Sequence, residues 1–418
     1  MSPTFGRTSG HAALPRRARV AIVGGGILGC AAAWHLARAG TRDVVVLERD
    51  DLNAATTSQA AGLIGQLRTS EVKSSIVGQT LADIAGFEAE GLVSGFTRTG
   101  SLRLALTPER EDEIREQVSA ARRFGVDATL VGADDIKRLA PGVAPVKDHP
   151  AAWMPNDGYA EPYTLATTYA TAARRLGVTF VSGCEVLGIR VVGGRARGVT
   201  TRDGDVEAEA VVIAAGAWTG AIAARAGGAI PAFAIRHQAW VTAPMDWLTP
   251  TFPVVRVPDR LAYLRREVGG LMLGFFETTP LGVDVAAHVD FGVAATPRDR
   301  EVLTTHAAAL LDVIPGLADA PVVGGTAGVP TYTPDGHFVV GELPSIAGVF
   351  VATGCCAHGI AGSGGVGRAL AEAVTGETPT RDPRPMAPGR FGARAWDAAW
   401  VRVACEETYA HYYDLVRR

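Results

Sequence analysis

The first fifty residues carry an apolar pattern that predicts a strand, a helix and a second strand. Residues 20–23 are apolar β-formers, residues 31–39 are small and apolar with the spacing of a buried helix, and residues 44–47 are again apolar β-formers. A glycine-rich turn separates the first strand from the helix. This order is typical of the first βαβ unit of a doubly wound α/β domain.

Three glycines and one acidic residue stand where a βαβ unit binds a dinucleotide. Gly24 allows the tight turn, Gly26 lets a pyrophosphate approach the backbone, and Gly29 lets the helix pack on the strand. Glu48 closes the second strand and can accept a hydrogen bond from a ribose hydroxyl. Because this pattern lies near the start of the chain and has no second copy, it favours bound FAD over diffusible NAD.

Helical and strand patterns alternate along the rest of the chain. Helices are expected at 76–87, 109–124, 163–176, 298–314 and 397–415, and strands at 100–105, 178–181, 186–192, 198–201, 211–216, 237–242, 261–266, 271–276 and 349–352. The segment 51–65 is small and polar, which suits a backbone cradle, and the glycine-dense stretch 354–367 leads into a helix ending near 374. Elements of a nucleotide-binding domain therefore alternate with insertions that build a second, sheet-bearing domain.

Composition narrows the class of protein. The chain has 418 residues, 47% of them hydrophobic, and a formal net charge of −3 without a clustered basic patch, so we expect a globular enzyme with no nucleic-acid partner. No apolar stretch reaches the length of a membrane span, so no membrane partner is expected. Five cysteines without CxxC or metal-ligand spacing predict reduced thiols in the cytoplasm and no bound metal.

Several short motifs together resemble one family of flavoenzymes. They are Thr56–Leu63, Gly100–Arg103, Asp157–Tyr159, Ala214–Trp218, Arg236–Gln238, Tyr263–Arg265 and Thr331–Asp335. In this order they resemble the D-amino-acid-oxidase superfamily, and within it the dimethylglycine and sarcosine dehydrogenases and oxidases. The resemblance covers residues 18–415 and implies an α/β fold in which a glutathione-reductase-type FAD-binding Rossmann domain is interleaved with an α+β substrate domain.

The resemblance also implies domain boundaries. A tail is expected at 1–17, the FAD-binding domain at 18–75, 160–225 and 325–385, the substrate domain at 76–159 and 226–324, and a helical C-terminal tail at 386–418. The segment 407–415 resembles one that leads into a folate-binding domain in larger relatives. Because the chain stops there, no folate partner is expected.

The resemblance places FAD against four stretches of this chain. The residues expected to bind it are Gly24, Gly26, Ile27, Leu28, Gly29, Glu48, Arg49, Thr56, Thr57, Ser58, Gln59, Ala61, Gly62, Leu63, Val186, Ala215, Gly216, Trp218, Gly354, His358, Gly359, Ile360 and Ala361. Two positions that tether flavin covalently in relatives are here occupied by Gln59 and Gly328, neither of which can form such a link. We therefore expect FAD to be bound non-covalently.

Three residues are expected to act on the substrate. His237 matches a substrate-site histidine, whose role is to orient the amine or keep it deprotonated. Tyr263 matches a pocket tyrosine, and Arg68 matches a carboxylate-binding arginine. The lysine that sarcosine oxidases use for the substrate carboxylate is replaced by Ala361, which indicates a different substrate.

These expectations combine into one function and two alternatives. The chain is expected to be an FAD-dependent amine oxidoreductase that oxidises the C–N bond of a secondary or N-methylated amino-acid-like amine to an imine, which water then hydrolyses. O2 or an electron-transfer acceptor takes the electrons. The alternatives are an amino-acid oxidase or dehydrogenase acting on a primary amine to give an imino and then a keto acid, and a flavin-binding subunit of a larger oxidoreductase.

Overall fold

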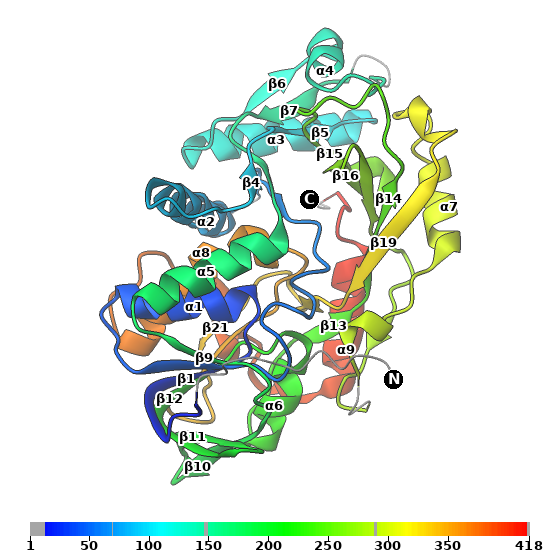
Figure 1. The fold of residues 1–418 in the computed structure, drawn as a ribbon. Helices are drawn as coiled ribbons and strands as arrows, with labels where there is room; N and C mark the ends of the chain where they lie inside the picture. The colour runs from blue at the N-terminus through cyan, green and yellow to red at the C-terminus, as the bar shows by residue number, and fades with distance from the viewer. Residues whose placement is uncertain (1–12, 69, 146–148, 288–290, 416–418) are drawn as a thin grey trace, which may run out of the picture.

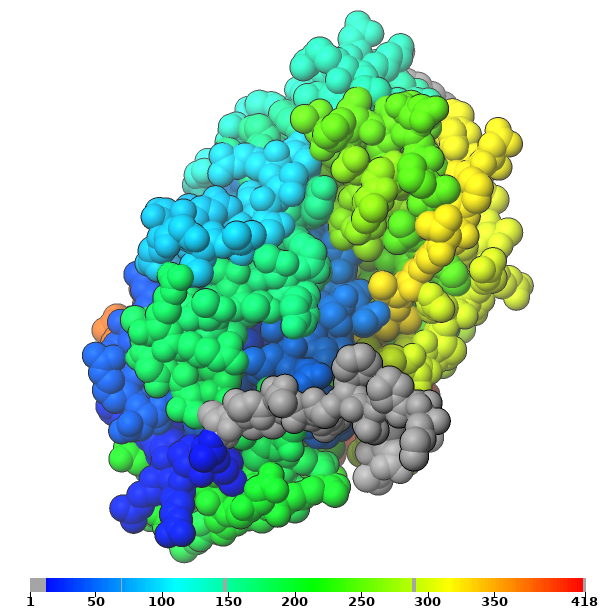
Figure 2. Space-filling model, in the orientation of Figure 1, coloured from blue at the N-terminus to red at the C-terminus, as the bar shows by residue number. Residues whose placement is uncertain are grey.

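The computed structural model describes residues 13–68, 70–145, 149–287 and 291–415. Two large sheets lie at opposite ends of an elongated molecule (Figure 1). In the space-filling view, blue and green segments form the lower end, and cyan and yellow-green segments form the upper end (Figure 2). Residues 1–12 of the expected tail lie outside the described residues, and Arg17 already begins the first strand.

The lower sheet has eight strands and a parallel centre. Its parallel strands, in spatial order, are β9 (Thr179–Val181), β2 (Val44–Leu47), β1 (Arg17–Val23), β12 (Gly204–Ile213) and β22 (Val349–Thr353). Antiparallel strands β21 (Val339–Glu342), β10 (Val186–Val192) and β11 (Arg195–Thr201) complete it. Every residue of β2 and β22 is buried, as a parallel sheet covered by helices requires.

Four helices gather next to this sheet: α1 (Ile27–Arg38), α2 (Glu71–Ala89), α5 (Pro162–Arg175) and α8 (Gly359–Thr375). Glycines let α8 approach its neighbours. A Cβ at Gly367 would come within 2.8 Å of the Ala31 backbone, and one at Gly364 within 2.8 Å of the Thr80 backbone. The glycine-dense stretch therefore forms a packing face, and it holds the N-terminus of α8 against the lower sheet.

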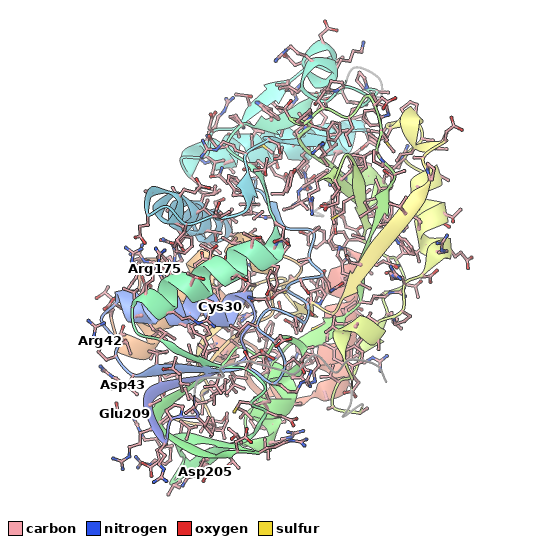
Figure 3. All side chains as sticks on the ribbon, in the orientation of Figure 1. Cys30, Arg42, Asp43, Arg175, Asp205 and Glu209 are labelled. Atoms are coloured by element: carbon pink, nitrogen blue, oxygen red, sulfur yellow. The ribbon has the colours of Figure 1, made fainter. Side chains whose placement is uncertain are left out.

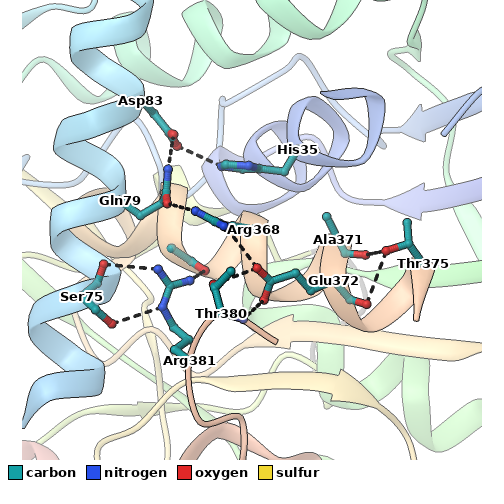
Figure 4. Close-up of polar contacts among 11 residues, drawn as sticks. His35, Ser75, Gln79, Asp83, Arg368, Ala371, Glu372, Thr375, Thr380 and Arg381 are labelled. Carbon is teal, nitrogen blue, oxygen red and sulfur yellow. Dashed lines mark hydrogen bonds and ion pairs between the residues drawn. The ribbon is translucent and has the colours of Figure 1, made fainter. Parts of the chain in front are cut away.

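A buried polar network also joins α1, α2 and α8 (Figure 4). The Asp83 carboxylate contacts His35 Nε2 at 2.9 Å and accepts hydrogen bonds from Tyr169 and Gln79 at 2.8 Å. Gln79 in turn accepts one from Arg368 at 2.9 Å. Because an unpaired buried carboxylate is costly, these partners fix the relative positions of the helices.

The upper sheet also has eight strands, mostly antiparallel. Their order is β19 (Val322–Gly328), β14 (His237–Thr242), β17 (Gly270–Phe275), β16 (Ala262–Glu267), β15 (Val254–Val257), β5 (Ser101–Leu104), β7 (Ala151–Met154) and β6 (Thr129–Val131). Helices α3 (Pro108–Arg123), α4 (Ala133–Leu139) and α7 (Arg300–Ala308) lie at this end of the molecule. A separate apolar core packs beneath the sheet.

Short elements connect the two ends. One small sheet contains β3 (Leu63–Ile64), β8 (Gly158–Ala160) and β4 (Phe96–Thr97), and another contains β18 (Gly282–Val283), β13 (Phe233–Ile235) and β20 (Thr331–Tyr332). Helix α6 (Thr219–Arg225) follows β12, and α9 (Ala398–Ala410) packs on β13 and β20. The C-terminal helix therefore reaches the middle of the molecule.

The mixed α/β fold and most expected elements are confirmed. The hairpin joined through Gly193 and Gly194 is present, and both glycines have positive φ, as a tight hairpin turn requires. The helix expected at 298–314 is wrong in extent. It begins after Asp299, whose carboxylate caps Glu301 N and Val302 N, and it ends at Ala308.

Charged side chains lie on the surface of the lower end, while mostly apolar residues fill its interior. Figure 3 shows exposed Arg42, Asp43 and Glu209 at the outer edge of the lower sheet and exposed Arg175 at the end of α5, whereas Cys30 on α1 is fully buried. Among the described residues, no helix combines the length and hydropathy needed to cross a membrane.

Candidate active site

A cavity of about 270 Å³ runs between the two sheets, from the start of α1 to β14 and β16. Most residues expected to bind FAD line it: Gly24, Gly26, Ile27, Leu28, Glu48, Arg49, Thr56, Thr57, Gln59, Ala61, Gly62, Leu63, Val186, Ala215, Gly216, Trp218, His358, Gly359, Ile360 and Ala361. His237 and Tyr263 line its other end. The lining does not include Gly29, Ser58, Gly354 or Arg68. Arg68 nevertheless contacts His358, which does line the cavity.

The start of α1 is open toward this cavity. Gly24 has a φ of +106°, and a Cβ at Gly29 would overlap the Gly24 carbonyl, so both positions need glycine. Gly26 caps the helix with no side-chain hydrogen bond, and no acidic residue lies in the first turn. The helix dipole and these backbone N–H groups suit a pyrophosphate.

Glu48 is held rigidly at the end of β2. Its carboxylate accepts hydrogen bonds from Gly25 N at 2.7 Å and Asp50 N at 2.9 Å, and burial raises its pKa. The lone pairs that remain can receive a ribose hydroxyl. Farther along, the Arg49 guanidinium lies 4.5 Å from the Trp218 ring centre and borders the same end of the cavity.

A strained loop precedes α8. Cys356 and Ala357 have φ of +45° and +58°, the left-handed region that non-glycine residues rarely occupy. The loop is held by hydrogen bonds from Cys356 N to Thr331 O at 2.8 Å and from His358 N to Cys355 O at 2.7 Å. It presents the uncapped N-terminus of α8 to the cavity, where a positive dipole end suits an anionic ring system.

The two positions without a covalent tether lie side by side in the cavity wall. A Cβ at Gly328 would lie 3.3 Å from the Gln59 Cβ and 3.2 Å from Thr56 Cγ2. The Gln59 amide donates to Ser58 Oγ at 3.2 Å. The elongated cavity, the open helix start and this wall fit FAD without a tether.

His237 is the centre of one wall of the substrate end, which we call the His237 wall and define as His237, Tyr263, Phe276 and Tyr409. His237 Nε2 lies 2.8 Å from the Tyr263 hydroxyl, and Nδ1 lies 3.2 Å from the Tyr409 hydroxyl. Burial lowers the pKa of His237 to about 4 and raises that of Tyr263. Both side chains are therefore neutral at physiological pH.

A missing side chain makes room for Tyr263. Gly274 on β17 pairs with Tyr263 on β16, and a Cβ at Gly274 would overlap the Tyr263 ring and hydroxyl. The tyrosine thus lies flat across its neighbouring strand and not perpendicular to the sheet. This small-residue position fixes where the hydroxyl meets the cavity.

The adjoining wall, which we call the His358 wall, consists of Arg256, His358 and Tyr412, with Arg68 behind His358. It meets the His237 wall where Arg256 pairs with Tyr263 across β15 and β16. His358 Nε2 lies 2.8 Å from Arg68 Nη1 and 2.6 Å from the Tyr412 hydroxyl. Burial and the nearby Arg68 charge lower the pKa of His358, so the ring is neutral. Because a guanidinium only donates, Nε2 must be the acceptor.

Two buried guanidinium groups give this wall positive charge. Arg68 Nη2 is buried and has no hydrogen-bond partner among the described residues, and burial lowers the pKa of Arg68. Arg256 Nη1 donates to the Tyr413 hydroxyl at 3.1 Å and also lines the cavity. The Asp157 charge acts on Arg68 from a distance, and the hydrogen bonds that its oxygens accept come from Gln66 and Ser101.

Sequence reasoning missed several residues of the substrate end. Arg256, Phe276 and Tyr412 line the cavity, and Tyr412 stacks on Phe276 with ring centres 3.8 Å apart. Tyr409 is completely buried behind His237. The aromatic run in the last twenty residues was the available signal, since three tyrosines on one amphipathic segment indicate a packed face. In the described part of the chain, no cluster of histidine, cysteine and acidic residues could hold a metal.

Comparison with known proteins agrees with this geometry. The family model described as FAD dependent oxidoreductase matches residues 19–373. Human mitochondrial sarcosine dehydrogenase is 31% identical over 96% of this chain and 45% of its own length. The 4-methylaminobutanoate oxidase (formaldehyde-forming) of Paenarthrobacter nicotinovorans is 31% identical over 99% of this chain and 50% of its own.

Among solved structures, L-proline dehydrogenase from P. horikoshii superposes with a TM-score of 0.82 at 26% identity, covering 90% of this chain and 98% of that one. The chain spans about half the length of the curated relatives above. FAD is the cofactor of these homologues, and the cavity described here has the features to bind it. The chain belongs to the DAO family of FAD-dependent oxidoreductases.

Proposed function

We propose that this protein oxidises the C–N bond of a secondary or N-methylated amine that also carries a carboxylate. The pair of buried guanidinium groups carries the proposal: Arg256 lines the cavity, and Arg68 Nη2, next to it, has no hydrogen-bond partner among the described residues. A buried donor and its charge gain a partner when an anion binds. A relative named for oxidising a methylamino acid with release of formaldehyde supports the substrate class.

FAD, when bound, accepts a hydride from the carbon next to the amine nitrogen. The residues of the chain bind and orient the substrate. Arg256, with Arg68 behind His358, holds the carboxylate, while Tyr263, the cross-strand neighbour of Arg256, meets the amine. Ile360 and Ala361 in the first turn of α8 line the cavity, so the positive end of this helix would stabilise negative charge on a flavin bound there.

The remaining steps need no further group from the chain. The oxidised amine leaves as an imine or iminium, which water hydrolyses to an amine and an aldehyde, the aldehyde being formaldehyde when a methyl group is attacked. The electrons would pass to O2 or to an electron-transfer protein. We also propose a cytoplasmic location, because the cysteines of the described residues are free thiols. The proposal keeps the division into an FAD-binding domain and a substrate domain that the sequence predicts.

The proposal includes non-covalent FAD. Acid precipitation of the yellow holoenzyme is expected to leave the flavin in the supernatant, because neither Gln59 nor Gly328 offers a nucleophile. Flavin absorbance that stays with the washed pellet would contradict this, and peptide mapping would then identify the attachment residue.

The test of the whole proposal is anaerobic mixing of the holoenzyme with a panel of N-methyl, cyclic and primary amino acids. Bleaching of the flavin by N-methyl amino acids, with formaldehyde as product, is the expected result. Bleaching by primary amino acids alone, with ammonia as product, would assign the protein to amino-acid oxidation. A flavin that no amine bleaches would favour a binding subunit.

A further inference from the structure

A chain of hydrogen bonds leads from the backbone to the cavity through the C-terminal helix. Glu277 N donates to the Tyr409 oxygen at 3.4 Å, and the Tyr409 hydroxyl lies 3.2 Å from His237 Nδ1. His237 Nε2 lies 2.8 Å from the Tyr263 oxygen. Tyr409 is completely buried on α9, far in sequence from the strands that carry the other members.

The direction of this chain follows from which atoms still need a partner. The Glu277 carboxylate lies nearby, but it already accepts from Arg236 Nε and Nη2 and from Gln238 Nε2. Among the described residues, His237 Nδ1 is therefore the acceptor that remains for the Tyr409 hydroxyl hydrogen. A buried hydroxyl without an acceptor would be destabilising, so Tyr409 donates to Nδ1.

The tautomer of His237 is then determined. Its Nδ1 has no hydrogen, so the single hydrogen of the neutral ring lies on Nε2 and is donated to the Tyr263 oxygen. Burial lowers the pKa of His237 to about 4, so the imidazolium form is not populated at neutral pH. The hydrogen of Tyr263 itself is left pointing toward the cavity.

We propose that Tyr409 is a positioning residue that fixes His237 as the Nε2–H tautomer and thereby makes Tyr263 a hydrogen-bond donor to the substrate. The hydrogen-bond direction is independent of the proposed function, and only the identity of the substrate atom rests on it. That atom must have a lone pair, so the site selects the neutral amine over the ammonium. His237 orients Tyr263 and takes no proton from the substrate.

The neighbouring Tyr332 offers a matched control. It is also completely buried, and its ring centre lies 5.1 Å from that of Tyr409. Its hydroxyl has no hydrogen-bond partner among the described residues. Tyr332→Phe therefore removes the same atoms from the same apolar cluster without touching the hydrogen-bond chain.

The direct test is ¹⁵N NMR of the holoenzyme with labelled histidine, with the His237 signals assigned from the His237→Asn variant. We expect an unprotonated Nδ1 and a protonated Nε2 in the wild type and in Tyr332→Phe. In Tyr409→Phe both nitrogens are expected to move to intermediate shifts, because either tautomer then leaves one group unpaired. A protonated Nδ1 in the wild type would overturn the proposal, and so would unchanged shifts in Tyr409→Phe.

A kinetic cycle gives a second readout. Tyr409→Phe is expected to slow anaerobic flavin reduction about fivefold to tenfold, the effect of one lost hydrogen bond, and to have no further effect in a Tyr263→Phe background. An equal loss in both backgrounds would mean that Tyr409 acts only through packing. If no amine reduces the flavin, the proposed function fails, but the NMR shifts still decide the tautomer.

Discussion

Each wall of the substrate end contains a buried imidazole, but the hydrogen bonds around His237 are nearly all satisfied and those around His358 are not. On the His237 wall the Tyr409 hydroxyl and His237 Nε2–H each have an acceptor. Only the Tyr263 hydroxyl hydrogen, which faces the cavity, has none among the described residues. On the His358 wall one nitrogen lone pair receives both Arg68 and Tyr412, and Arg68 Nη2 has no partner in the described structure. The hydrogen bonds of the first wall are complete without a ligand. The second wall has more donors than acceptors, and in the proposed function the substrate carboxylate supplies the missing acceptor.

The largest effect is expected from Gly274→Ala, which disrupts the His237 wall alone. The added Cβ overlaps Tyr263 and displaces its hydroxyl, so flavin reduction should slow about 100-fold, the size of effect that a misplacement near 1 Å produces. Stopped-flow anaerobic reduction measures it. Gly324→Ala on β19 of the same sheet meets open space and is the control. Equal rates in the two variants would contradict the assigned role of Tyr263.

The second-largest effect is expected in the pH profile of kcat/KM, which tests whether the imidazoles of both walls stay neutral. Burial lowers the pKa of both imidazoles, His237 to about 4, so neither titrates above neutral pH. Only the substrate amine gains or loses a proton there, and kcat/KM should rise about tenfold per pH unit until the amine pKa is reached. Two substrates with different amine pKa values should give profiles displaced by that difference. A shared inflection near pH 6–7 would instead indicate an imidazole acting as a base.

The same groups predict how stability depends on pH. His237 has a pKa of about 4 in the folded protein against 6.5 as its ordinary value, so the unfolded chain binds the proton more readily. The free energy of unfolding should therefore fall as pH decreases from 6.5 toward 4, by at most about 3 kcal/mol from this residue. Urea unfolding of wild type and His237→Asn at several pH values measures the difference. Parallel curves for the two proteins would contradict a lowered His237 pKa.

The smallest effect is expected from Tyr412→Phe. This change removes one of two donors to His358 and keeps the stack on Phe276, so substrate affinity should change by no more than about threefold. Tyr412→Ala also removes the stack and should raise KM more than the phenylalanine variant does. Equal KM values for the two variants would mean that the aromatic contact does not shape the site.

The fold was predictable to the extent that its elements carry their own signals. The strand before Gly24 and the hairpin at Gly193 read correctly because apolar runs and glycine turns are local features. The helix at 298–314 was predicted too long, since its spacing pattern continues past the point where the chain turns. The order of strands in the upper sheet depends on pairings between distant segments, which periodicity does not reveal.

The candidate site likewise contains residues that local sequence patterns predict and residues that only tertiary packing brings together. Residues expected to bind the dinucleotide through backbone geometry, such as Gly24 and Gly26, follow from sequence spacing and line the cavity. Tyr409 and Tyr412 do not follow, because their positions depend on α9 packing across β13 and β20. The roles of individual residues expected from the resemblance stay predictions until they are tested.

The most direct test compares two substrates in two proteins. One substrate is an N-methyl amino acid that bleaches the flavin, and the other is its amide, which lacks the carboxylate; both are used at matched concentrations of neutral amine. Losing the carboxylate should reduce kcat/KM about 100-fold in the wild type but only about tenfold in Arg68→Met, because Arg256 alone then pairs with the carboxylate. An equal loss in both proteins would contradict the account, since Arg68 would then not hold the anion.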